Sequence, residues 1–215
     1  MTNSLTDMSD QQIDRLIGAL DSLKDGDLAV DMLIACGERA IRALALFLLK
    51  GSPRSISLPR CRAARALGAL GACSALLTYF REYERPPDAA VLFAEDAVRS
   101  AAAHELARWK CDEVFQLLFD AARQRATGEL VVVLGEFQRP QTIPLLYELL
   151  EDDLCRGHAM ESLQGMSDAA RQYAILAIRG SVDLKLDGPT AIVGRGGSHP
   201  APHTPCEQEA LRRAE

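Results

Sequence analysis

Residues 60–71 read RCRAARALGALG, and this stretch decides the fold. Its apolar positions, counted from Ala63 as offset 0, lie at offsets 0, 1, 4 and 7. They are occupied by Ala63, Ala64, Leu67 and Leu70. Residues three and four apart stack on the same side of an α-helix, so these four side chains form one stripe. The stretch therefore predicts an amphipathic helix that buries one narrow face.

The same pattern recurs along the chain. The leucine at offset 4, called here the stripe leucine, is Leu33, Leu67, Leu106, Leu134 and Leu163 in the successive copies. A second amphipathic segment follows each copy, at residues 38–50, 74–84, 112–123, 141–151 and 168–179. Each unit is predicted to be a helical hairpin. One hairpin cannot bury its stripe alone, so neighbouring hairpins must stack into a continuous core.

Residues 60–71 resemble the first helix of a HEAT repeat of the short bacterial kind labelled phycobilisome-lyase HEAT-like. An arginine seven residues before the stripe leucine supports the resemblance in three copies (Arg60, Arg99 and Arg156), and residues 143–146, IPLL, resemble the start of a HEAT second helix. The resemblance covers about residues 26–179. It departs in the first copy, which lacks the arginine, and in the fourth, where Thr127 replaces it.

The resemblance implies an all-α fold, namely a right-handed α-solenoid (alpha-alpha superhelix, armadillo-like) of about five HEAT-like hairpins, and it implies no single activity. We expect residues 1–25 to form an N-terminal capping helix, because Ser9 and Gln12 have capping-box spacing. Residues 26–180 are expected to form the repeat array. Residues 181–215 are expected to be a flexible tail, because they are rich in glycine and proline. Residues 83–94 contain Pro86 and Pro87 and are expected to form a protruding loop.

Composition and charge indicate the cellular compartment and exclude some classes of partner. The 215 residues are 48% hydrophobic and 25% charged, which is typical of a globular protein. The formal net charge of −6 argues against general nucleic-acid binding. Residues 1–10 lack the basic start of a secretory signal, and the longest apolar run, 43–49, is too short to span a membrane. Six cysteines without a CxxC pair fit a reducing cytoplasm. We therefore expect a cytoplasmic protein that does not bind membranes.

The sequence offers little support for a catalytic or metal centre. His104 and Glu105 invite comparison with deoxyhypusine hydroxylase, a HEAT-like enzyme whose several His-Glu pairs bind iron. That family places its pairs near the start of first helices, whereas here a single pair lies in mid-helix. His199, His203 and Cys206 lack a fourth ligand for zinc. We predict no catalytic residue, no cofactor and no metal.

The leading hypothesis is a non-catalytic protein–protein interaction scaffold or adaptor that binds a protein partner in its concave groove. HEAT arrays usually present their second helices on that face, which makes the polar residues there candidate partner contacts: Arg42, Arg81, Gln116, Asp120, Arg123, Gln141 and Glu148. The repeat arginines Arg60, Arg99 and Arg156 are expected to be structural and to pair with acids or carbonyls of adjacent repeats.

Two enzymatic alternatives stay open. The first is a subunit of a phycobilin-lyase-like enzyme that attaches a chromophore to a bilin-carrying protein. The second is a HEAT-like DNA glycosylase, whose groove should be basic and lined by exposed aromatic residues and a carboxylate. The acidic net charge disfavours the second, as does Trp109, which aligns with core positions of the other copies.

Overall fold

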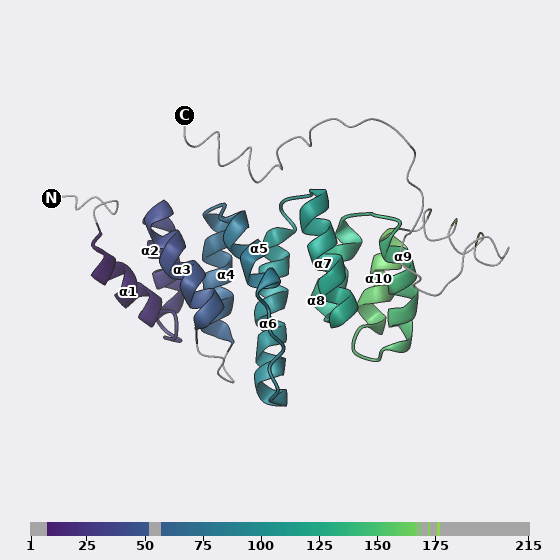
Figure 1. Ribbon diagram of the computed structural model, residues 1–215, viewed down its shortest axis with the longest axis horizontal. Helices are drawn as coiled ribbons and strands as arrows, with labels where there is room; N and C mark the ends of the chain where they lie inside the picture. Colours follow the sequence, from purple (N-terminus) through teal and green to yellow (C-terminus); the bar gives the residue numbers. More distant parts are fainter. Residues whose placement is uncertain (1–7, 52–56, 167, 169–171, 173–175, 177–215) are drawn as a thin grey trace. The chain divides into compact units, whose positions relative to one another are not determined.

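The computed structural model of the chain describes residues 8–51, 57–166, 168, 172 and 176 (Figure 1). Every regular element in this part of the chain is a helix, which confirms the predicted all-α class. The chain divides into two compact units, Met1–Lys110 and Cys111–Glu215. The division falls inside the predicted repeat array. The predicted tail, 181–215, lies outside the described residues, as does most of the last second helix expected at 168–179.

The described part of unit 1 contains six helices in two layers. They are α1 (Asp10–Ala19), α2 (Gly26–Ala35), α3 (Glu38–Lys50), α4 (Leu58–Ala69), α5 (Cys73–Arg81) and α6 (Ala89–Leu106). Helices α2, α4 and α6 pack in succession and form the even layer, whereas α1, α3 and α5 pack in succession and form the odd layer (Figure 1). Contacts of α1 with α2, of α3 with α4 and of α5 with α6 join the two layers.

Unit 2 has a core of its own. Its helices are α7 (Asp112–Gln124), α8 (Gly128–Glu136), α9 (Thr142–Glu148) and α10 (Arg156–Gly165), with a 3₁₀ turn at Leu149–Glu151. Helix α8 packs against α7, α9 and α10. The core around α8, α9 and α10 includes Val131, Ile143, Leu146 and Ala159, whose side chains are fully shielded from solvent.

The stripe leucines fill the two cores as their spacing predicts. Leu33, Leu67, Leu106 and Leu134 are completely buried, and Leu163 is half-buried. Burying a leucine side chain contributes about 1.5–3 kcal/mol, so the stripe is a main source of stability. No helix in the described part of the chain has the length and apolar character needed to cross a membrane.

The start of α1 has the predicted capping box. Ser9 Oγ accepts a hydrogen bond from the Gln12 N–H at 3.4 Å, and Gln12 Oε1 accepts one from the Ser9 N–H at 2.7 Å. Both backbone donors would otherwise lack a partner within the helix. Within the predicted capping segment, 1–25, the helix itself spans Asp10–Ala19 and packs on both α2 and α3.

The prediction of a protruding loop at residues 83–94 is wrong for the second half of this segment. Helix α5 ends at Arg81, but α6 already begins at Ala89 and continues for 18 residues. Asp88 explains the early start, because its Oδ1 accepts a hydrogen bond from the Val91 N–H at 2.9 Å and so caps the helix. The two prolines lie after the end of α5 at Arg81, and they do not prevent a new helix from starting behind them.

The turns after three of the stripes share a positive φ angle, whereas Lys110, four residues after Leu106, does not have one. Gly37 and Gly71 both lie four residues after a stripe leucine, and they have φ angles of +63° and +70°. Gln138 occupies the same position after Leu134, with a φ angle of +54°, which is uncommon for a residue with a Cβ atom. Its side chain compensates in part, because Gln138 Nε2 donates a hydrogen bond to the Gly135 carbonyl at 2.8 Å. These three turns thus share a positive φ angle although the residue differs.

First helices also approach each other closely at one recurring position. Gly68 of α4 directly follows its stripe leucine, and a Cβ atom there would lie 2.7 Å from the Cβ of Glu105 on α6. Gly135 of α8 directly follows its stripe leucine too, and a Cβ there would lie 2.7 Å from the Cβ of Ser162 on α10. Two carbon atoms pack best at about 3.5–4.0 Å, so only glycine permits this approach. Glu105 and Ser162 each directly precede a stripe leucine, which means that both helix pairs meet in the same register.

Candidate functional site

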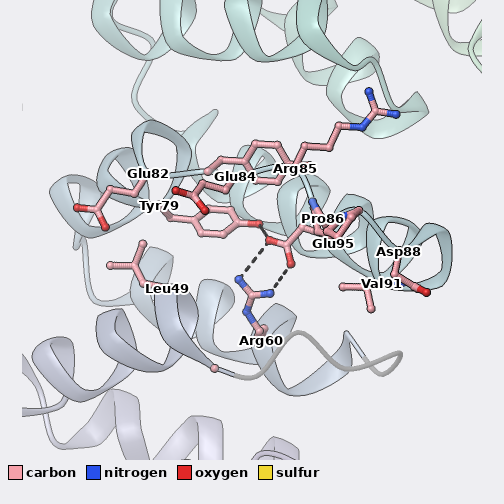
Figure 2. Close-up of a pocket in the computed structure, with 13 residues that line it drawn as sticks. Leu49, Arg60, Tyr79, Glu82, Glu84, Arg85, Pro86, Asp88, Val91 and Glu95 are labelled. Carbon is pink, nitrogen blue, oxygen red and sulfur yellow. Dashed lines mark hydrogen bonds and ion pairs between the residues drawn. The ribbon is translucent and has the colours of Figure 1, made fainter.

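A cluster of buried polar groups in unit 1 is built around Arg60 (Figure 2). Arg60 on α4 forms an ion pair with Glu95 on α6, in which Nη1 donates to Oε2 and Nη2 donates to Oε1 at 3.2 Å. Tyr79 on α5 donates its hydroxyl proton to Glu95 Oε1 at 2.5 Å. Arg60 also donates to the Leu48 carbonyl of α3, from Nε at 2.9 Å and from Nη2 at 2.6 Å. The network therefore joins four helices.

The Leu48 carbonyl explains why an arginine is useful at this position. It belongs to the last turn of α3, where carbonyl groups have no partner within the helix. Buried polar groups without hydrogen bonds are costly, and the guanidinium satisfies this one while it neutralises Glu95. Burial and the adjacent Glu95 charge raise the pKa of Tyr79 well above its ordinary value, so its hydroxyl stays protonated and remains a donor. The cluster is suited to holding helices together, and Tyr79 is not poised to transfer a proton.

A pocket of about 520 Å³ lies over this network. Leu49, Tyr83, Pro86, Pro87 and Val91 give it apolar walls, and Arg60, Tyr79 and Glu95 also line it (Figure 2). The other charged lining residues are exposed, and three of the four are acidic: Glu82, Glu84, Arg85 and Asp88. Both oxygens of Glu95 are occupied within the network, so the buried groups at the pocket serve each other.

The three repeat arginines have different surroundings. Arg156 resembles Arg60, because its Nε donates to the Leu150 carbonyl of the preceding 3₁₀ turn at 2.8 Å. Its side chain is half exposed and pairs with Asp153 at 2.8 Å. Arg99 is only 2% exposed, and its guanidinium lies 4.5 Å from the centre of the Tyr83 ring. It approaches Asp96 at 4.0 Å.

Arg62 is a further buried arginine that the sequence pattern did not single out. Its Nη1 donates to the carbonyls of Leu20 and Ser22, each at 2.8 Å, and its Nε donates to Asp27 at 3.1 Å. It thus satisfies carbonyl groups just beyond the end of α1, as Arg60 does at the end of α3. The position lies off the apolar stripe, and three other arginines surround it in the sequence, so nothing local distinguished it.

The predicted partner-contact residues are all exposed. Arg42 lies on α3 and Arg81 is the last residue of α5, both in the odd layer of unit 1. The others belong to unit 2 and lie on α7 or at the two ends of α9: Gln116, Asp120, Arg123, Gln141 and Glu148. Gln116 donates to Asp120 at 3.0 Å along one face of α7. Exposure makes these residues available for contact.

Arg42 also lines a second hollow, a groove of about 360 Å³ between α1 and α3. Apolar residues of both helices form part of its surface, and charged residues of both helices flank them. Sequence reasoning identified Arg42 but not the groove. The groove needs α1 beside α3, and the spacing of apolar residues does not specify that packing.

His104 and Glu105 do not lie in a metal-binding arrangement. His104 is exposed, whereas Glu105 is buried against Gly68 and its Oε2 lies 3.0 Å from Arg108 Nη2. In the described part of the chain, no group of three His, Cys, Asp or Glu residues is placed to hold a metal ion. His199, His203 and Cys206 lie outside the described residues. The five described cysteines carry free thiols.

Glu105 gives a testable pH dependence. Burial raises the pKa of its carboxyl above the ordinary value, against the opposing effect of Arg108. A carboxyl with a raised folded-state pKa binds its proton more tightly in the folded chain, so stability falls as the pH rises from the unfolded value through the folded one. We expect Glu105→Gln to raise the free energy of unfolding at neutral pH, with the gain shrinking toward about pH 4. Urea denaturation at both pH values measures it, and a loss of stability at neutral pH would instead assign Glu105 a favourable charge pair with Arg108.

Trp109 is less buried than the prediction of a core residue requires. It is half-buried, and it lies in the last turn before the boundary of unit 1. The aligned residues Cys36, Phe137 and Met166 are buried, but Leu70 is half-buried like Trp109. The position thus marks the edge of the stripe.

No family model, curated protein or solved structure matches the chain.

Proposed function

We propose that the chain is a HEAT-type right-handed α-solenoid of about five helical hairpins and acts as a scaffold or adaptor that binds a protein partner. The observation that carries the proposal is the recurring register between first helices. Gly68, which follows the stripe leucine of α4, contacts Glu105, which precedes the stripe leucine of α6. Gly135 of α8 and Ser162 of α10 make the same contact. A single contact geometry repeated along a chain is what stacked repeats require.

Two further repeats of geometry support the same proposal. Gly37, Gly71 and Gln138 have positive φ angles at the same distance from their stripe leucines. Arg60 and Arg156, which also share a repeat position, each donate to a carbonyl at the end of the preceding helical segment. Two of the three repeat arginines thus make equivalent contacts in separate hairpins, whereas Arg99 packs over Tyr83.

A binding function fits the distribution of the side chains. The buried polar groups of unit 1 connect its helices to each other, whereas polar side chains of the odd layer, such as Arg42 and Arg81, are exposed. Stacked helical repeats use such extended faces to bind other proteins. The partner is proposed to lie against these second helices, in a cytoplasmic setting.

Affinity capture with charge-reversal variants tests the proposal. The full chain is immobilised and exposed to an extract of its native cells, in parallel with Arg42→Glu, Arg81→Glu and Arg123→Glu. We expect at least one protein to be retained by the unaltered chain and lost with one or more of these variants. Arg65→Glu is the matched control, because Arg65 is an exposed arginine of α4 in the even layer. Retention of no protein, or equal retention by all variants, would refute the scaffold function.

A further inference from the structure

The groove between α1 and α3 has an apolar floor built with helical periodicity. Its apolar residues are Ile13 and Ile17 on α1, and Ala43 and Leu46 on α3. Ile13 is buried at the base, Ile17 and Ala43 are half-buried, and Leu46 is 45% exposed. An exposed leucine in a lined hollow is different from one on a convex surface, because a ligand can cover it from several sides.

The two sides of the groove carry opposite charges. Asp10 and Asp14 line it from α1, whereas Arg39 and Arg42 line it from α3. Arg39 and Asp10 approach each other at 3.5 Å, but their side chains are 47% and 95% exposed, so this pair is weak. Among the described residues, Asp14 and Arg42 make no ion pair. Through Asp14 and Arg42, each side of the groove can therefore attract a charge of its opposite sign.

On each helix the lining residues lie at offsets 0, 3, 4 and 7, which is one helical face. That span corresponds to a length of roughly 10 Å, or two helical turns. A ligand that follows such a groove and fills it with an apolar stripe is an amphipathic helix. A nucleic acid or an anionic membrane would gain no net attraction, because two acids and two arginines cancel.

We propose that this groove binds an amphipathic helix of a partner protein, with basic residues on the flank that faces α1 and acidic residues on the flank that faces α3. This inference rests on the proposed scaffold function and specifies the chemistry of its partner at one site. Turning the ligand end to end would exchange its flanks, so the two charged sides of the groove also select one direction for the bound helix.

The test uses the full chain and two labelled synthetic peptides of 18 residues. Both carry a leucine stripe. The mixed peptide has lysine on one flank and glutamate on the other, whereas the uniform peptide has lysine on both. Fluorescence anisotropy measures both dissociation constants. We expect the unaltered chain to prefer the mixed peptide by about fivefold or more, as two partly exposed ion pairs allow.

Variants of the groove make the test specific. Arg39→Glu/Arg42→Glu makes both sides acidic and is expected to reverse the preference toward the uniform peptide. Leu46→Asp is expected to weaken binding of both peptides about tenfold, because it places a charge on the apolar floor. Arg65→Glu on α4 serves as the control and should change neither constant. Leu46 and both arginines are exposed, so these variants leave the core intact.

Three outcomes would overturn the proposal. They are no binding of either peptide, a preference that the double variant leaves unchanged, and self-association of the chain in sedimentation that Leu46→Asp abolishes, which would assign the groove to a second copy. The capture experiment separates this failure from failure of the scaffold function. A partner lost with Arg81→Glu or Arg123→Glu, but retained by Arg39→Glu/Arg42→Glu, would keep the scaffold function and discard the groove.

Discussion

Replacing Glu95 with alanine is expected to lower the free energy of unfolding of unit 1 by about 3–5 kcal/mol, because the buried Arg60 guanidinium loses its counter-charge. The Arg60 and Glu95 side chains are 10% and 6% exposed, so water cannot replace the lost carboxylate easily. The Tyr79 hydroxyl, in a side chain only 2% exposed, loses its acceptor as well. Chemical denaturation followed by the fluorescence of Trp109 measures the effect, since the chain's single tryptophan lies in the same unit.

An exposed ion pair in the same unit provides the matched control. Asp10→Ala removes the carboxylate that approaches Arg39 at 3.5 Å, and it is expected to cost less than about 1 kcal/mol. In the double variant Arg60→Met/Glu95→Leu no charge stays buried without a partner, so its loss should be smaller than the sum of the two single losses. If Glu95→Ala costs no more than Asp10→Ala, the Arg60 network does not hold the helices of unit 1 together.

The apolar stripe predicted the helices well because its information is local. Leu67 and its neighbours repeat with the period of an α-helix, and burial of the stripe depends only on which face turns inward. The predicted second helix at 38–50 matches α3 at both ends. Residues 83–94 were harder to predict, because Pro86 and Pro87 favour a break, whereas the cap formed by Asp88 starts a helix immediately behind them. Two opposing local signals lie within three residues there.

The candidate sites were less predictable because they depend on contacts across the fold. The partner of Arg60 is 35 residues away on α6 and lies off the stripe, so its identity as Glu95 needs the packing of α4 against α6. Arg99 has the same sequence position but lies over Tyr83, because its neighbours differ. The charged sides of the α1/α3 groove each look like an ordinary solvated helix face in the sequence. Only their juxtaposition makes a site.

Gly135→Ala is expected to destabilise unit 2 by about 1–2 kcal/mol. The effect is expected although alanine stabilises an isolated helix by up to about 1 kcal/mol relative to glycine. The new methyl carbon would lie 2.6 Å from Ser162 Oγ, 2.7 Å from Ser162 Cβ and 3.3 Å from its Cα. The backbone fixes the position of Ser162 Cβ, so a side-chain rotation relieves only the contact with Oγ, and α10 must move away from α8. Hydrogen exchange of α8 and α10 reports the opening free energy of this helix pair.

A compensating double variant separates overpacking from a simple intolerance of substitution at Gly135. Gly135→Ala/Ser162→Gly adds a methyl group to α8 and removes the hydroxymethyl group that it would meet on α10, so protection should recover part of what Gly135→Ala loses. The hydrogen bond from Ser162 Oγ to the Val131 carbonyl, at 3.3 Å, is lost in this variant. Gly157→Ala on α10 is the matched control, because a Cβ atom there would meet nothing within 4 Å, and it should leave protection unchanged or raise it by up to about 1 kcal/mol. If Gly135→Ala behaves like Gly157→Ala, α8 and α10 do not need glycine at their crossing. The shared register would then be a consequence of packing elsewhere and not the constraint that makes the hairpins stack.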